Sequence, residues 1–246
     1  MVSTRHHPRD FAPPSTARAS TPSTTSESST SSSKKWVHTP ATAVTLWLLI
    51  SCPLVLWDSG YVLLRPHSMP GGKWHSPIWS PYELYGTVDY IYGWPAYNAK
   101  NGFTAAQAIL NLAETAAYLY YLWAVYRYGV PATSTSRGSS KPQQGPRSAF
   151  IGGRVVAGRT GAIALLVAFS ASVMTLSKTL LYWVQEYCSD FENIGHNDIW
   201  TLVIFWIIPN GLWLVFPAYS LHILGEEIVS SLANGAPRQR GRPKLQ

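Results

Sequence analysis

The fold class is decided by residues 160–184, which read TGAIALLVAFSASVMTLSKTLLYWV and carry a single charge, Lys178. An α-helix needs roughly 20 apolar residues to cross a hydrocarbon core of about 30 Å. A helix of this length on a soluble protein would carry a polar stripe along its exposed face. This stretch has none, so it predicts a transmembrane helix.

Three further segments have the same character, at residues 39–64, 103–126 and 199–224. The first contains one charge, Asp58, the second contains Glu114, and the last contains none. Each is long enough to cross a bilayer with some tilt. The sequence therefore predicts an all-α membrane protein built as a four-transmembrane-helix bundle.

The whole-chain averages hide this pattern, because the mean hydropathy of +0.00 combines apolar helices with polar ends. Residues 1–38 are rich in Ser and Thr and are predicted to be a disordered cytoplasmic tail. Residues 230–246 form a basic tail, also predicted to be disordered, so the membrane domain spans 39–229. With two cysteines in 246 residues, a disulfide scaffold is excluded.

The net charge of +7 is distributed unevenly. Most Lys and Arg residues lie in the two tails and in the loop 127–159, which four spans would place on one side of the membrane. Under the positive-inside rule that side is cytoplasmic, together with both termini. The positive charge therefore indicates orientation, and we expect no nucleic-acid partner. The remaining long loop, 65–102, is lumenal and rich in Trp and Tyr, which predicts a lid at the membrane interface.

Asp58, Glu114 and Lys178 are the charged residues inside the predicted spans. An ionisable residue within the membrane is costly and marks a functional site by default. Counted from the helix ends, all three lie in the lumenal half of the bilayer, where they are expected to share one polar pocket. The alternative is that they pair with one another only to hold the helices together.

Amide and indole side chains extend the predicted pocket. Gln107 and Asn111 share a helix face with Glu114, since the three are spaced i, i+4 and i+7. In a pocket of low dielectric, Asp58 and Glu114 would differ in pKa and divide the acid and base roles, so they are the candidate catalytic residues. An ionised carboxylate beside tryptophan faces would also hold a cationic amine.

Neither a metal nor a cofactor is expected. The lumenal His67, His75 and His196 have spacings that match no metal motif, and no phosphate-binding loop or nucleophile elbow occurs in the chain.

Several short segments resemble those of a known family. Residues 210–217 read NGLWLVFP and resemble the Asn-x-Leu-Trp-Leu-Val-x-Pro segment of emopamil-binding protein, the sterol Δ8–Δ7 isomerase. The strings YGTVDY at 85–90, NGFT at 101–104 and LVLWD at 54–58 are similar to that family's loop, helix-two and helix-one segments. In this order and topology the chain resembles the EXPERA domain, which the sigma-two-type receptor shares.

The resemblance implies an endoplasmic-reticulum protein whose membrane-embedded pocket takes a sterol or a lipophilic amine. The isomerase carries a His four residues before a Glu on helix one, where this chain has Leu54 and Asp58; an Asp there is more similar to the sigma-two-type receptor. The helix-two site falls on Glu114 or, in a tighter alignment, on Gln107. The candidate ligand-binding residues are then Trp57, Asp89, Gln107, Asn111, Lys178, Asn210 and Trp213.

Three functions follow as expectations. The first is binding of a sterol or related lipid, with Asp58 and Glu114 as polar anchors. The second is an isomerase of a sterol or terpenoid that uses the same two carboxyl groups. The third is a structural or trafficking protein without ligand chemistry. Membrane lipids are expected partners in each case, and the oligomeric state is left open.

Overall fold

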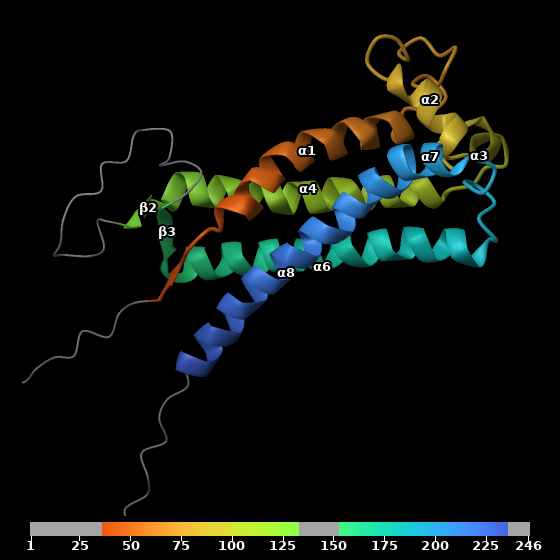
Figure 1. Cartoon of the computed structure of the whole chain (residues 1–246). Coiled ribbons are helices and arrows are strands. Elements are labelled where there is room, and N and C mark those ends of the chain that lie inside the picture. The colour runs from red at the N-terminus through yellow and green to blue at the C-terminus, as the bar shows by residue number, and fades with distance from the viewer. Residues whose placement is uncertain (1–35, 133–152, 236–246) are drawn as a thin grey trace, which may run out of the picture. The chain divides into compact units, whose positions relative to one another are not determined.

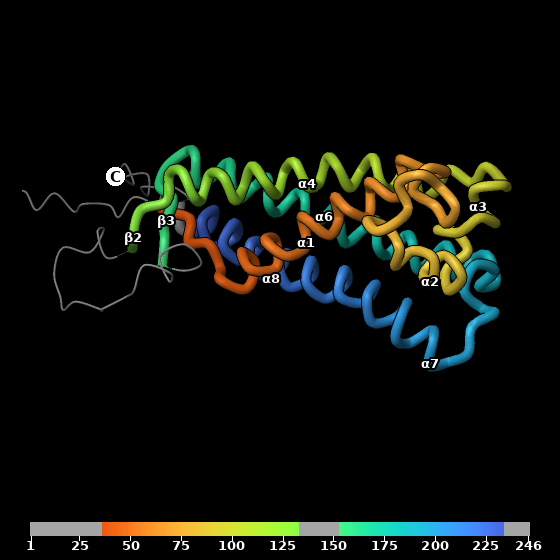
Figure 2. The backbone as a smooth tube through the Cα atoms, turned by 90° about the horizontal axis from the view of Figure 1, so that it is seen from above, coloured from red at the N-terminus to blue at the C-terminus, as the bar shows by residue number. Residues whose placement is uncertain are grey.

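In the computed structural model, residues 36–132 and 153–235 are described, and these are the residues to which the following statements apply. Four long helices make up most of this part of the chain (Figure 1). They are α1 (Thr42–Leu63), α4 (Phe103–Tyr128), α6 (Gly158–Cys188) and α8 (Ile208–Gly235). Helix α4 packs between α1 and α6, and α8 crosses α6 at an angle (Figure 1). Toward its α7 end, the segment made of α7 (Ile199–Leu202) and α8 spreads away from α4 (Figure 2).

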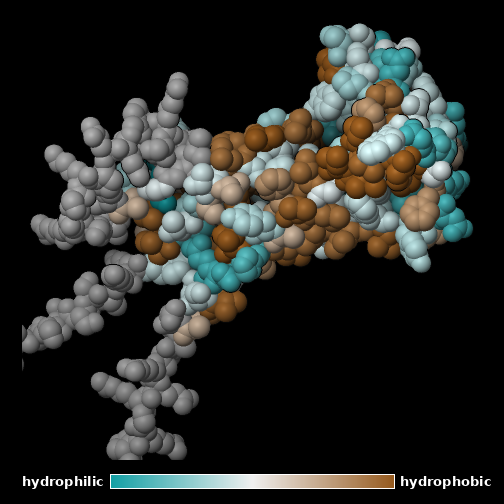
Figure 3. Space-filling model, viewed as in Figure 1, coloured by the Kyte–Doolittle hydropathy of each residue, from teal (hydrophilic) through white to brown (hydrophobic). Residues whose placement is uncertain are grey.

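Three of the described helical segments are long and apolar enough to cross a membrane: Thr42–Leu63, Gly158–Cys188 and Ile199–Ala233. On the face shown in Figure 3, hydrophobic residues gather over the middle of the long helices, and hydrophilic residues gather at the end that carries α2 and α3. This distribution supports the predicted all-α membrane class. Helix α4 is long enough to be a fourth span but is not apolar enough to count as one by composition. The described residues therefore contain three candidate spans, whereas the sequence predicts four.

The last candidate span, Ile199–Ala233, is assembled from three consecutive segments. Helix α7 (Ile199–Leu202) begins at Asp198, whose carboxylate accepts hydrogen bonds from the backbone N–H groups of Trp200 and Thr201 at 3.0 and 3.1 Å. Such a capping residue satisfies N–H groups that have no partner within the helix. A π-helical turn, η2 (Val203–Ile207), follows and runs into α8. Turns of this kind often occur beside functional sites.

A small antiparallel sheet closes one end of the bundle, with strand order β1-β3-β2. The strands are β1 (Val37–His38), β2 (Val130–Pro131) and β3 (Arg154–Ala157). These residues were assigned to the N-terminal tail and the basic loop, because strands this short carry too little alternation to be recognised in a sequence. Residues 230–235, predicted to belong to the disordered C-terminal tail, are instead the last residues of α8. The remaining predicted disorder falls on residues 1–35, 133–152 and 236–246, which lie outside the described residues.

The opposite end is covered by the loop 65–102, which contains α2 (Pro81–Val88) and α3 (Trp94–Asn98). Several of its aromatic rings pack inward: Tyr82, for example, is buried and stacks on Tyr61 of α1 with 3.8 Å between ring centroids. The chain passes close to itself at two glycines, since a Cβ on Gly93 would lie 2.3 Å from the carbonyl oxygen of Gly86. The loop is therefore an ordered cap built on the ends of the helices.

Candidate functional site

A cavity of about 480 Å³ lies beneath this cap, among α1, α2, α4, α6 and the η2–α8 segment. Its volume falls within the roughly 300–1,000 Å³ of small-molecule sites. Most of the residues predicted from the sequence line it, and only Glu114 and Asp89 do not. The lining consists of Leu54, Val55, Trp57, Asp58, Pro81, Tyr82, Leu84, Tyr85, Tyr92, Gln107, Asn111, Lys178, Thr179, Tyr182, Phe205, Pro209, Asn210 and Trp213.

The Asp58 carboxylate is the acidic group of this cavity. Its Oδ1 accepts a hydrogen bond of 2.5 Å from the Tyr82 hydroxyl. The ring of Trp57 lies beside Tyr82, with 5.0 Å between centroids, and its indole N–H donates to the carbonyl oxygen of Ile78 at 2.8 Å. Trp57 is thus held by the cap, and Tyr82, which belongs to the cap, is held by α1. A carboxylate framed by aromatic faces is suited to a cationic amine or to a hydroxyl donor.

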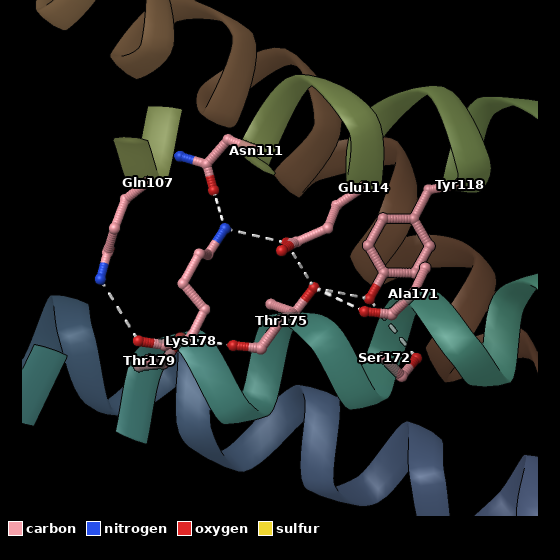
Figure 4. A network of polar contacts seen from close by, with 9 residues as sticks. All are labelled: Gln107, Asn111, Glu114, Tyr118, Ala171, Ser172, Thr175, Lys178 and Thr179. Atoms are coloured by element: carbon pink, nitrogen blue, oxygen red, sulfur yellow. Dashed lines mark hydrogen bonds and ion pairs between the residues drawn. The ribbon is translucent and has the colours of Figure 1, made fainter. Parts of the chain in front are cut away.

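Lys178, Asn111 and Gln107 form a second polar wall, between α4 and α6 (Figure 4). The Lys178 ammonium donates to Asn111 Oδ1 and, at 3.0 Å, to Glu114 Oε2. The Gln107 amide donates to the backbone carbonyl of Lys178 at 3.5 Å. Lys178 and Asp58 both line the cavity, so it contains one charged group of each sign. The predicted shared face of Gln107 and Asn111 is present and is turned toward α6.

Glu114 belongs to the helix interface and does not line the cavity, which corrects its placement as a ligand anchor. It lies one turn deeper than Asn111 and is only 4% exposed. Oε2 accepts the Lys178 ammonium and the Thr175 hydroxyl, the latter at 2.8 Å, and the Tyr118 hydroxyl lies 3.0 Å from that of Thr175. The network joins α4 to α6. Asp58 and Glu114 therefore do not form the paired carboxylates that an acid–base mechanism in one pocket would need.

Asn210 and Trp213 border the cavity from α8, where the family-like segment lies. The Asn210 amide donates to the carbonyl oxygen of Trp206 at 2.9 Å and to the Tyr85 hydroxyl at 3.5 Å. Trp213 contacts Trp47 of α1 edge-on, with 5.2 Å between ring centroids. Both residues thus connect α8 to elements across the cavity.

Asp89, predicted as a ligand contact, is fully buried outside the cavity lining. Its carboxylate accepts hydrogen bonds from the Tyr182 hydroxyl, from the Trp206 indole at 2.9 Å and from the backbone N–H of Ile91 at 3.2 Å. Burial raises the pKa of Asp89 to about 7, and the hydrogen bonds oppose this rise. Because Tyr182 lines the cavity, Asp89 is a positioning residue that joins the cap to α6 and η2.

Four tyrosines line the cavity that the sequence does not single out: Tyr82, Tyr85 and Tyr92 from the cap and Tyr182 from α6. The sequence shows that residues 65–102 are rich in aromatic side chains, but nothing in it shows which of them turn inward. Within the described residues, no group of three or more His, Cys, Asp or Glu side chains is arranged to hold a metal ion. The cavity can therefore offer hydrogen bonds, one charge of each sign and aromatic faces. Comparisons of the chain with protein-family models, curated proteins and solved structures find no match.

Proposed function

We propose that this chain is an EXPERA-type integral membrane protein of the endoplasmic reticulum that binds a sterol or related lipophilic ligand in the cavity beneath the cap. The main support for this proposal is the position of Asp58. Its carboxylate faces an aromatic-lined cavity at the end of a candidate membrane span and has Tyr82 as its hydrogen-bond donor.

The composition of the lining favours a largely apolar ligand with one polar group. Aromatic and aliphatic side chains make up most of the wall, and the polar groups are concentrated at Asp58 and at the Lys178–Asn111 pair. A carboxylate in the membrane is costly unless it has a partner. A ligand that carries a basic amine would supply a cation to Asp58 and aromatic contacts to Trp57 and Tyr82.

The same proposal includes four spans with both termini in the cytoplasm. Helix α4 has 26 residues, which at 1.5 Å per residue exceeds the roughly 30 Å of a hydrocarbon core. Its polar residues Gln107, Asn111 and Glu114 each form a hydrogen bond with α6. Within the described residues, Glu114 Oε2 has partners and the buried Oε1 has none. The orientation rests on the excess of basic residues in the tails and in the loop 127–159.

Binding is favoured over isomerisation by the position of Glu114. A double-bond isomerase needs one group to protonate the alkene and another to remove a proton. Here the second carboxylate is engaged by Lys178 and Thr175 at the helix interface. The contacts of Glu114 and Lys178 favour a structural role, in which the two side chains join α4 to α6.

The test is a ligand titration of the full-length protein in detergent, in which binding is detected by the rise in unfolding temperature. A lipophilic tertiary amine and an uncharged sterol are compared on the wild type, on Asp58→Asn and on Glu83→Gln, which neutralises a carboxylate that is 74% exposed. We expect Asp58→Asn to weaken amine binding at least about tenfold, because a hydrogen bond to a charged group is lost. Glu83→Gln should bind like the wild type. Equal amine affinity in all three proteins would overturn the proposal.

A further inference from the structure

A second cavity, of about 560 Å³, lies at the same end of the bundle, between the end of α1 and the turn that joins α3 to α4. It shares no lining residue with the first cavity. Its charged side chains are both cations, Arg65 and Lys100, and no carboxylate lines it. The remaining lining residues are Val62, Leu63, Tyr97, Asn98, Asn101 and Ala105. We call this cavity the basic groove.

Arg65 has donor capacity left over in the groove. Its guanidinium donates to the carbonyl oxygens of Val62 and Ile91, at 3.1 and 3.4 Å, and to the Thr104 hydroxyl at 2.7 Å. These acceptors are all neutral, and a guanidinium carries five N–H donors. Among the described residues, two of its N–H groups therefore have no acceptor. The carboxylate that interacts electrostatically with Arg65 is that of Asp58, which Tyr82 engages in the other cavity.

Lys100 occupies a backbone position where glycine is the usual residue. It has φ +55°, and the hydrogen bonds Lys100 N–H to Tyr97 O at 3.0 Å and Asn101 N–H to Ala96 O at 2.9 Å close the end of α3 in a Schellman motif. A side chain in this left-handed conformation is disfavoured relative to glycine. In the described part of the chain, its ammonium pairs with no carboxylate. Within the described residues, no ion pair therefore offsets the backbone cost of a lysine at this position.

The groove lies where a membrane would end. Leu63 is the last residue of the candidate span α1, and both Leu63 and Leu64 are exposed. An apolar rim of Leu63 and Ala105 is thus continuous with two cationic side chains. The phosphate groups of lipids lie at this depth, and Arg and Lys are the side chains that bind phosphate.

We propose that the basic groove binds the phosphate group of an anionic ligand, with Lys100 and Arg65 as its cationic contacts. The phosphate can belong to a lipid headgroup, with the acyl chain along Leu63, or to a free phosphate. The site is independent of the ligand proposed for the first cavity, because the two linings are separate.

The experiment uses the full-length protein in a neutral detergent, with dioleoyl phosphatidate as the lipid probe and inorganic phosphate as the free anion. Binding is measured by native mass spectrometry, and thermal unfolding is measured on the same samples. The informative variant is Lys100→Gly, which removes the cation and suits the left-handed backbone. Lys100→Arg keeps the charge. Lys73→Gly is the matched control, because Lys73 is an exposed lysine of the same cap outside the groove.

We expect Lys100→Gly to weaken phosphatidate binding about tenfold without lowering the unfolding temperature, and Lys73→Gly and Lys100→Arg to bind like the wild type. Displacement of the lipid by millimolar inorganic phosphate would identify the phosphate group alone as sufficient, whereas resistance would identify a lipid as the ligand. Unchanged binding in Lys100→Gly would overturn the proposal. An equal loss in Lys73→Gly would also overturn it, since the effect would then follow net charge.

Discussion

Removing one member of the buried ion pair between Lys178 and Glu114 should strongly destabilise the protein, and this loss is the most quantitative test of the helix interface. The two side chains are 9% and 5% exposed, and Nζ lies 3.0 Å from Oε2. Removing one member of a buried pair leaves an uncompensated charge and costs about 3–5 kcal/mol. Glu114→Gln should fall at the lower end of this range, because Asn111 still accepts from Lys178.

The assay is thermal unfolding of the detergent-solubilised protein, followed with a thiol-reactive dye. Cys52 is buried and reacts only on unfolding, whereas the exposed Cys188 is replaced by Ser to remove its background. For a chain of this length, about 1 kcal/mol corresponds to roughly 2–4 °C, so Glu114→Gln and Lys178→Met should each unfold roughly 6–20 °C below the wild type.

The double variant Glu114→Gln/Lys178→Met separates the pair from its individual members. With both charges absent, no unpaired charge remains, so it should be no less stable than Lys178→Met alone. The reasoning would be refuted if the two single losses added in the double variant. It would also be refuted if Glu114→Gln cost less than about 1 kcal/mol.

Two further predictions concern the cap and the cavity. Burial raises the folded-state pKa of Asp89 to about 7, above an unfolded value of about 3.9. Between about pH 4 and pH 7, the Asp89 carboxyl is therefore protonated in the folded protein and ionised in the unfolded chain, so the free energy of unfolding should fall as pH rises from about 4 to about 7 and level off above. Asp89→Asn should lose this pH dependence in unfolding curves, and a wild-type stability that rises with pH in that range would contradict the prediction. Val55→Trp places an indole in the cavity and should abolish the rise in unfolding temperature that a bound amine produces, whereas an undiminished rise would mean that the ligand binds elsewhere.

The sequence could predict the cavity walls that the helices supply. Asp58 and Lys178 were placed at similar depth by counting along the predicted spans, and the i, i+4 spacing put Gln107 and Asn111 on one face. These four residues do line one cavity. The same spacing puts Glu114 on the face of α4 that carries Gln107 and Asn111, but a helix face extends over several turns. Glu114 lies one turn beyond Asn111, and its carboxylate is therefore in the interface between α4 and α6 and not in the cavity.

The cap could not be predicted in this way, because its fold depends on contacts between distant residues. Asp89 bonds to Tyr182 and Trp206, which lie 93 and 117 positions away in the sequence. Composition identified the aromatic residues of the loop but not their direction, since pieces as short as α2 and α3 lack a long periodic pattern. Motif similarity likewise pointed to Asp89 without showing that it lies outside the cavity lining.

The most direct test of the ligand pocket is mass spectrometry of the lipids that co-purify with the full-length protein. Wild type, Asp58→Asn and Glu83→Gln are purified in parallel in the same detergent and normalised to folded protein. A discrete lipophilic species, sterol-like in mass and retained by the wild type and Glu83→Gln but depleted in Asp58→Asn, is the predicted result. Identical lipid profiles in all three proteins would contradict a ligand anchored at Asp58.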